Sequence, residues 1–319
     1  MGKTIEITDE DYSQVIEIDD GVAQVCMNGV ETPPIEGEKS LVVAEHMREE
    51  AMQALNEDDE IYASGWKKRV IVITGASDGI GLEAARRFTL YADVVYNLDM
   101  ERQDDDNINF IKTDITNPES VNLAIQKIWD KEEQIDILIN NAGIGFAGSA
   151  EHATLDQINR VIGTNFIGTC LVTSAVIPLM RERRRGTIMN LASQTGISNK
   201  KFQSIYNSSK SAVLAYSATL KEEVRPFGIK VTAILLGNIK SSFTEERIKN
   251  VEDNVYKYRF AKAISRAEFD EQSGKETEWV ARKLFTLSNK KFLKPITVFG
   301  AKYRMKLFFR KFSKQRVKG

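Results

Sequence analysis

The sequence predicts an α/β protein built on a doubly wound parallel sheet with helices on both faces, a three-layer α/β/α arrangement. Through the middle of the 319-residue chain, short β-branched runs alternate with longer helical patterns, which is the order that βα units produce. A glycine-rich turn follows the first β-branched run, where such sheets place a ligand. The 42% of hydrophobic residues is enough for a large core.

The predicted strands are short apolar runs, and the predicted helices are the longer patterns between them. We expect strands at residues 69–74, 94–98, 108–112, 135–140, 187–191, 229–236 and 295–299, and helices at residues 79–90, 118–131, 154–184 and 204–226. No apolar run approaches the roughly 18 residues of a membrane-spanning helix. Together with an acidic N-terminus that is unlike a secretory signal, this predicts a cytoplasmic location.

Cysteine and histidine are too scarce for a disulfide scaffold or a metal centre. The chain has two cysteines, Cys26 and Cys170, and two histidines, His46 and His152. We expect no disulfide framework and no metal site.

Charge divides the chain into three parts. Residues 1–65 carry a net charge of −14, residues 279–319 carry +13 without an acidic residue, and the part between is neutral. We therefore predict an acidic N-terminal extension of unknown role (1–65), a central domain (66–300) and a basic tail (301–319).

The acidic extension allows several interpretations. Residues 16–28 contain Asp-Gly between two strand-like runs, which predicts a hairpin, and residues 40–57 have a helical pattern. A small subdomain, a flexible arm and an intramolecular partner for the basic tail are all compatible with this.

The basic tail has an amphipathic helical spacing. Met305, Phe308, Phe309 and Phe312 recur at i, i+3, i+4 and i+7, with basic residues on the other faces. One hypothesis is peripheral contact with an anionic membrane. The alternative, which we favour, is a helix that caps a pocket or a subunit interface. We expect no nucleic-acid binding, because no recognised module accompanies the tail.

The glycine-rich turn has the composition of a dinucleotide site. Gly75, Ser77, Asp78, Gly79, Ile80 and Gly81 lie between the first strand and the first long helix. Glycines there let the backbone approach a pyrophosphate, which then lies on the helix N-terminus. A turn without a ligand is the alternative, but the strand before it and the helix after it favour a cofactor.

Asp99 ends the second strand and indicates which cofactor binds. An acid about 20 to 25 residues after the glycines can accept hydrogen bonds from a ribose, whereas a 2′-phosphate would meet like charge. NAD(H) is therefore favoured, with NADP(H) as the alternative, and Asp78 acts in the same direction. Asp99 could also merely end the strand.

Other strand ends supply supporting candidates. Asn141, Ala142 and Gly143 follow the fourth strand at the edge where the sheet places its ligand. Asp114 and Ile115 follow the third strand and could contact an adenine ring.

A tyrosine and a lysine stand one helical turn apart. Tyr206 and Lys210 are i and i+4 at the start of a helix, so both side chains lie on one face. A nearby ammonium and a cationic nicotinamide could lower a tyrosine pKa from about 10 towards 7, which suits proton transfer, although this spacing also occurs by chance. Ser193 ends the fifth strand and could bind a substrate oxygen. Asn165 in mid-helix either holds a relay water or marks a kink.

In this order and spacing, TGASDGIG, NNAG, Asn165, Ser193 and YNSSK resemble the short-chain dehydrogenase/reductase family. The resemblance covers about residues 69–300. It implies a single-domain Rossmann fold that binds NAD(P), and a tetrad of Asn165, Ser193, Tyr206 and Lys210. Tyr206 would be the general acid/base, and Lys210 would bind the nicotinamide ribose and lower the tyrosine pKa. Ser193 would orient the substrate oxygen and Asn165 a proton-relay water. Relatives of this kind are usually homo-oligomers.

The chain departs from the family pattern after the sixth strand. The family usually has Pro-Gly followed by a threonine, whereas this chain has Gly237 without the proline, then Ile239, and Ser241 in place of the threonine. A serine keeps the hydroxyl that would contact the nicotinamide carboxamide. We expect a looser turn and a changed grip on the cofactor rather than loss of activity.

The substrate remains open at this level. The family's pocket loops contribute Ile144, Phe146, Ile197, Phe202 and residues 241–260 here, mostly apolar side chains that suit a hydrophobic carbonyl or secondary alcohol. These side chains could also simply pack the lid. The leading function is an oxidoreductase that transfers hydride; the alternative is a dinucleotide-binding regulator or scaffold with little turnover.

Overall fold

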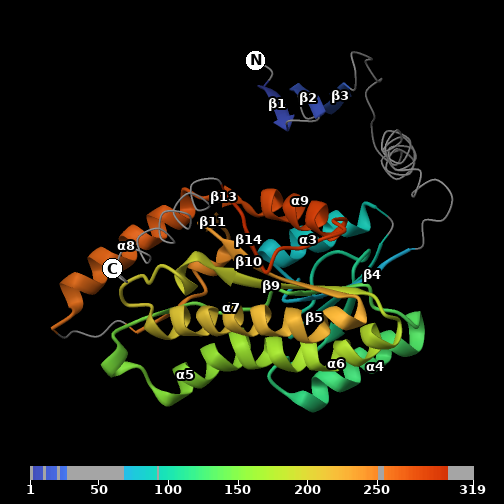
Figure 1. Cartoon of the computed structure of the whole chain (residues 1–319). Coiled ribbons are helices and arrows are strands. Elements are labelled where there is room, and N and C mark those ends of the chain that lie inside the picture. Colours follow the sequence, from blue (N-terminus) through green and yellow to red (C-terminus); the bar gives the residue numbers. More distant parts are fainter. Residues whose placement is uncertain are drawn as a thin grey trace, which may run out of the picture. The chain divides into compact units, whose positions relative to one another are not determined.

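A computed structural model describes residues 3–9, 12–19, 22–26, 68–91, 93–250 and 255–300 (Figure 1). The chain divides into two units, residues 1–67 and 68–319. The predicted helix at residues 40–57 and the amphipathic tail at residues 301–319 lie outside the described residues.

The first unit contains three antiparallel strands. They are β1 (Lys3–Asp9), β2 (Tyr12–Asp19) and β3 (Val22–Cys26). Strand β2 pairs with β3 through Val15 with Cys26 and Asp19 with Val22, as the Asp-Gly hairpin signal predicts. Strand β1 pairs with β2 and extends the hairpin to three strands. We did not predict this third strand from the sequence.

The second unit is built on a seven-stranded parallel sheet in the order β14-β10-β9-β7-β4-β5-β6. Its strands are β4 (Val70–Thr74), β5 (Val94–Asp99), β6 (Asn109–Lys112), β7 (Ile137–Asn140), β9 (Gly186–Ser193), β10 (Ile229–Leu236) and β14 (Ile296–Val298). All are parallel. The order reverses between β4 and β7, and a doubly wound sheet binds its ligand at the carboxyl side of that point. The predicted fold class is confirmed.

Helices cover both faces of this sheet (Figure 1). They are α3 (Gly79–Thr89), α4 (Pro118–Glu132), α5 (Leu155–Ile162), α6 (Thr169–Glu182), α7 (Ser204–Val224), α8 (Lys257–Gln272) and α9 (Thr277–Ser288). Short two-stranded pairs join β8 (Phe146–Ala147) to β12 (Ile248–Lys249) and β11 (Ile239–Lys240) to β13 (Lys275–Glu276). Short 3-10 turns lie at residues 150–152, 194–196, 225–227 and 242–244.

Successive side chains of β4 point to opposite faces of the sheet, and each face has its own hydrophobic core. Val70 and Val72 pack into a cluster with residues of α4, α6 and α7, whereas Ile71 and Ile73 pack with residues of α3 and α9 on the other face. All five residues of β4 are buried and the first four are apolar, as expected for a strand that is covered on both faces. The β-branched run that predicted this strand therefore fills both cores.

The long predicted helix at residues 154–184 is interrupted. A π-helical turn, Gly163–Gly168, separates α5 from α6 and contains Asn165. Leu155–Glu182 is long and apolar enough to cross a membrane, judged by length and composition alone, contrary to our expectation that no stretch would qualify. In α6, however, Val172, Val176 and Met180 are fully buried against the sheet.

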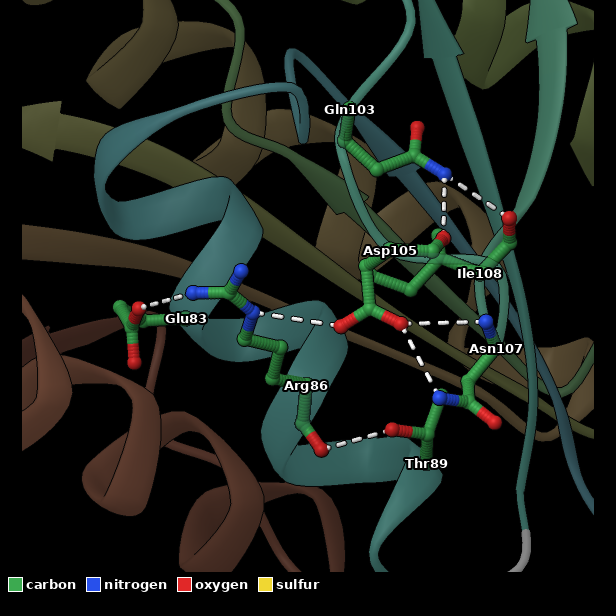
Figure 2. Close-up of polar contacts among 7 residues, drawn as sticks. All are labelled: Glu83, Arg86, Thr89, Gln103, Asp105, Asn107 and Ile108. Atoms are coloured by element: carbon green, nitrogen blue, oxygen red, sulfur yellow. Dashed lines mark hydrogen bonds and ion pairs between the residues drawn. The ribbon is translucent and has the colours of Figure 1, made fainter.

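Polar contacts fix the loop between β5 and β6 to helix α3 (Figure 2). Arg86 Nε lies 3.2 Å from Asp105 Oδ2, and the other oxygen of Asp105 accepts from the backbone N–H of Asn107 at 3.0 Å. Gln103 Nε2 donates to the carbonyl oxygens of Asp105 and Ile108 at 3.1 and 2.8 Å. The loop that begins directly after Asp99 is thereby held in place.

Candidate active site

A cavity of about 710 Å³ lies where the carboxyl ends of the strands meet. Fifteen residues predicted from the sequence line it: Gly75, Ser77, Asp78, Gly79, Ile80, Asp99, Asn141, Ala142, Gly143, Ser193, Tyr206, Lys210, Gly237, Ile239 and Ser241. The predicted cofactor turn and the predicted catalytic pair thus face one space, although they are more than 120 residues apart in the chain.

The glycine-rich turn is packed too closely for side chains. Gly75 has a φ of +68°, and a Cβ on Gly81 would lie 2.1 Å from the carbonyl oxygen of Gly75 and 2.6 Å from Asn141 Nδ2. Asn141 Nδ2 donates to the carbonyl oxygens of Thr74 and Gly75 at 3.0 and 2.7 Å. Gly81 therefore supports the turn from behind and does not line the cavity.

The first turn of α3 is open to an anion. Asp78 precedes the helix but makes no side-chain hydrogen bond to the first turn of α3. Its carboxylate accepts instead from the hydroxyl of Ser242. Since the free N–H groups at a helix N-terminus attract phosphate, these residues fit the pyrophosphate of a dinucleotide.

Asp99 lies beside the same turn. Its Oδ2 accepts from the backbone N–H of Ser77 at 3.2 Å and its Oδ1 from that of Met100 at 2.7 Å. Asn97 Oδ1 accepts from the N–H of Ala76 at 2.9 Å. The end of β5 therefore holds the glycine turn and presents a carboxylate where the sequence predicts the ribose.

Tyr206 and Lys210 project from the first turns of α7. Both line the cavity, and the Tyr206 ring packs on Phe243 with centroids 5.7 Å apart. Ser193, at the end of β9, lies beside the phenol and lowers its pKa. The carbonyl-orienting hydroxyl and the phenol expected from the sequence are therefore adjacent.

The phenol of Tyr206 has a raised pKa in the chain itself. Burial raises the pKa of Tyr206 to about 12, with Glu271 raising it further and the Ser193 hydrogen bond and Arg247 lowering it. The predicted fall towards 7 depends on a cationic nicotinamide beside the ring and stays a prediction; within the chain itself, desolvation of the phenolate outweighs the favourable contacts. The phenol is therefore protonated at neutral pH in this structure, which is the state that a proton donor needs.

Lys210 is buried beside the turn that follows β7. Its Nζ donates to the carbonyl oxygen of Leu191 at 3.0 Å, and burial lowers the pKa of Lys210 to about 8. A Cβ on Gly143 would lie 3.2 Å from this Nζ. The absence of a side chain at Gly143 leaves room for the ammonium at the cavity wall.

Asn165 lies behind the cavity and does not line it. Its side chain accepts from the N–H of Ile144 at 2.7 Å and donates to the Ile144 carbonyl and to Ser209 Oγ, both at 3.0 Å. Because this amide is fully buried, its visible role is to hold the loop after β7 against α7. The relay water stays a prediction.

The segment after β10 is braced without the family's proline. Asn238 Oδ1 accepts from Gln194 Nε2 at 3.0 Å, and its carbonyl accepts from the N–H of Lys275 at 3.1 Å. Strand β11 pairs with β13 next to it. These contacts hold the turn, and the predicted change in its grip on the cofactor stays a prediction.

Five further predicted contact residues lie away from the cavity. Asp114 accepts from its own loop, from the N–H and hydroxyl of Thr116, and Ile115 is buried beside Gly168. Phe146 is fully buried, and Phe202 packs against Phe260 and Tyr256. These two phenylalanines, expected to line the substrate pocket, belong to packing: Phe146 is buried in β8, and Phe202 packs against α8. Ile197 likewise packs in the core.

A charged cluster that we did not predict from the sequence lines the cavity. Glu271 lines the cavity together with Lys200 and Thr244. Its Oε2 lies 2.6 Å from Arg247 Nη2 and accepts from Thr244 Oγ1 at 3.1 Å, and its Oε1 lies 3.3 Å from Lys200 Nζ. Glu271 therefore joins the loop after β9, the segment after β10 and helix α8. This part of the cavity wall is charged, and it adjoins the apolar Ile144 and Phe243.

We expect Glu271→Gln to destabilise the protein by about 3 kcal/mol, because it leaves the Arg247 guanidinium, whose side chain is 2% exposed, without its buried partner. The variant should also lower the pKa of Tyr206, since Glu271 raises it. Denaturant unfolding and the high-pH limb of the rate profile measure the two effects.

Glu268→Gln is the matched control on the same helix. Its ion pair with Lys249, at 2.8 Å, is partly exposed, so a loss below about 1 kcal/mol is expected. Equal losses in the two variants would contradict the central position of Glu271.

The comparison with protein families agrees with this geometry. The model of the family described as short chain dehydrogenase matches residues 69–252, more than half of the chain. The chain belongs to the short-chain dehydrogenase family. As a family member it carries the expected glycine turn and the Ser193–Tyr206–Lys210 arrangement in one cavity.

Relatives within the family cover much of the chain. A 3-ketodihydrosphingosine reductase from Bacteroides thetaiotaomicron is 38% identical over 182 residues, which are 56% of this chain and 67% of that protein. The structure of ElxO with NADP bound is similar with a TM-score of 0.63 and 27% identity over 75% of this chain and all of that one. A 3-ketoacyl-(acyl-carrier-protein) reductase from Brucella melitensis, complexed with NADH, has the same fold at 23% identity, with a TM-score of 0.62 over 73% of this chain and 97% of that one.

Proposed function

We propose that this short-chain dehydrogenase is an NAD(H)-dependent oxidoreductase that interconverts a carbonyl group and a secondary alcohol. One observation carries the proposal: a single cavity brings Tyr206, Ser193 and Lys210 beside the glycine turn and Asp99. The nicotinamide would supply or accept the hydride, while the chain supplies a proton and holds the substrate oxygen.

The proposed roles follow from protonation and contacts. Tyr206, protonated at neutral pH, donates its proton to a carbonyl oxygen during reduction and accepts it in the reverse direction. Ser193 orients that oxygen from the end of β9. Lys210, charged below pH about 8, binds the ribose of the cofactor, and Asn165 holds the loop that borders it.

We propose NAD(H) as the preferred cofactor because Asp99 places a carboxylate at the predicted ribose position. No basic residue replaces it at the end of β5, where Asp99, Met100 and Glu101 line the cavity. A 2′-phosphate at this position would meet negative charge.

We expect Asp99→Asn to raise the ratio of kcat/KM for NADPH to that for NADH by about tenfold or more. The substitution removes the charge and keeps an oxygen that can accept from Ser77 or Met100. Steady-state kinetics with both cofactors measure the ratio, with Asp114→Asn as the control on a carboxylate outside the cavity. A wild-type enzyme that already prefers NADPH would refute the assignment.

We propose a keto lipid with polar groups near its carbonyl as the substrate class. The support is twofold: 38% identity to a protein named 3-ketodihydrosphingosine reductase, and the polar cluster of Lys200, Thr244 and Glu271 beside Tyr206, next to the apolar Ile144 and Phe243. This narrows the hydrophobic carbonyl or secondary alcohol expected from the sequence.

The test compares 3-ketodihydrosphingosine with a ketone of equal chain length that lacks its polar substituents, following NADH absorbance. Faster reduction of the first supports the substrate class, and equal rates contradict it. Tight NADH binding without turnover on any ketone or alcohol of the panel would favour the regulator or scaffold instead.

A further inference from the structure

Helix α8 has an outer face that combines aromatic and basic side chains. Tyr258 and Phe269 are 77% and 71% exposed, and eleven residues, or three helical turns, place them on one line. Lys262 lies between them on that line, Arg259 and Arg266 flank it, and Val255, directly before the helix, is 85% exposed. Figure 1 shows α8 at the periphery of the second unit.

The opposite face of α8 is fully used by the fold. Phe260 and Ile264 are buried in a cluster with Ala147 and Phe202, Ala267 is buried, and Glu271 lines the cavity. These positions follow the i, i+4, i+7, i+11 spacing of one helix face. The exposed aromatic residues are therefore not part of the core on that side.

The charges on α8 are segregated as well. Arg259, Lys262 and Arg266 are exposed and make no ion pair with any described residue. Glu268 and Glu271 are in ion pairs with Lys249 and Arg247, whereas Asp270 is partly buried and lies one helical turn after Arg266, at the margin of the outer face. The outer face is consequently basic.

We propose that this outer face of α8, formed by Val255, Tyr258, Arg259, Lys262, Arg266 and Phe269, docks on an anionic membrane surface. Exposed cations attract acidic headgroups, and aromatic rings lie well at the boundary between headgroups and acyl chains. A second copy of the chain fits less well, because two copies of this face would bring like charges together.

The position of the helix links docking to the cavity. Glu271 lines the cavity from the inner side of α8, so docking brings the cavity within about one helix diameter, roughly 10 Å, of the membrane surface. A lipid substrate could then pass between bilayer and cavity over a short path.

Sedimentation of the full-length chain with vesicles tests the proposal without measuring turnover. The chain should bind phosphatidylcholine vesicles that contain about a third phosphatidylserine, and bind them less as salt rises. Lys262→Ala with Arg266→Ala should weaken binding about 30-fold, and Tyr258→Ala with Phe269→Ala should weaken it too. Thermal unfolding checks that each variant is folded.

Lys112→Ala with Lys127→Ala is the matched control, since it removes two exposed lysines from β6 and α4. It should bind as the wild type does. The proposal is overturned if the α8 variants bind like the wild type, if the control loses as much, or if pure phosphatidylcholine vesicles bind equally. It is overturned too if the wild-type chain binds duplex DNA as tightly as the acidic vesicles and the α8 variants lose both, because the face would then bind any polyanion.

Discussion

Tyr206→Phe should lower kcat for carbonyl reduction by about 10³-fold or more while leaving the Kd for NADH nearly unchanged. The substitution removes the only part of the side chain that can donate a proton, and positioned general acids typically contribute two to four orders of magnitude. The ring that packs on Phe243 stays, so the cavity keeps its shape. Single-turnover reduction and fluorescence titration with NADH measure the two quantities.

A second tyrosine on the same helix provides the control. Tyr216 is also largely buried, and burial likewise raises its pKa to about 12, but it packs against Phe166 and does not line the cavity. Tyr216→Phe should leave turnover within about twofold. If Tyr206→Phe retained more than a tenth of the activity, the proton would have to come from another group.

Lys210→Ala should weaken NADH binding by about tenfold or more and lower kcat by about 10²-fold. The buried ammonium bonds only to the Leu191 carbonyl in the described structure, so it has further N–H groups for a ribose. Because burial lowers its pKa to about 8, the charge is lost at lower pH than for an ordinary lysine. NADH affinity of the wild type should therefore fall as pH rises through about 8.

The pH dependence separates this role from general damage. In Lys210→Ala, NADH affinity should no longer change around pH 8. Lys221→Ala is the control, since Lys221 lies on the same helix and donates to the Leu293 carbonyl at 3.1 Å outside the cavity. Calorimetric titrations at several pH values measure both. An unchanged Kd in Lys210→Ala would refute the ribose contact.

The positions of the strands along the chain and the cofactor turn could be predicted because their causes are local. A strand covered on both faces is mostly apolar, so β4 is visible as a β-branched run and β10 as a largely apolar run. The glycine turn is visible because close packing around Gly81 excludes a side chain. Tyr206 and Lys210 could be paired because i and i+4 share a helix face.

The substrate side could not be predicted, because its causes lie between distant segments. Glu271 contacts Arg247 and Lys200, which are 24 and 71 residues away, and neither spacing has a periodic signature. Apolarity alone does not separate a core ring from a pocket ring, so Phe146 and Phe202 were placed in the wrong class. Burial also dominates the pKa of Tyr206 in the chain itself, and it depends on distant segments that the local sequence does not show.

Because of the π-helical turn at Gly163–Gly168, the orientation of Asn165 depends on the number of residues in this segment as well as on their types. A turn of this kind accommodates one residue more than a regular α-helix, and each residue adds about 100° of rotation. Deleting a single residue there would keep the helix but rotate Asn165 away from Ile144. Among homologues, chain length across this turn and the presence of the amide should therefore change together.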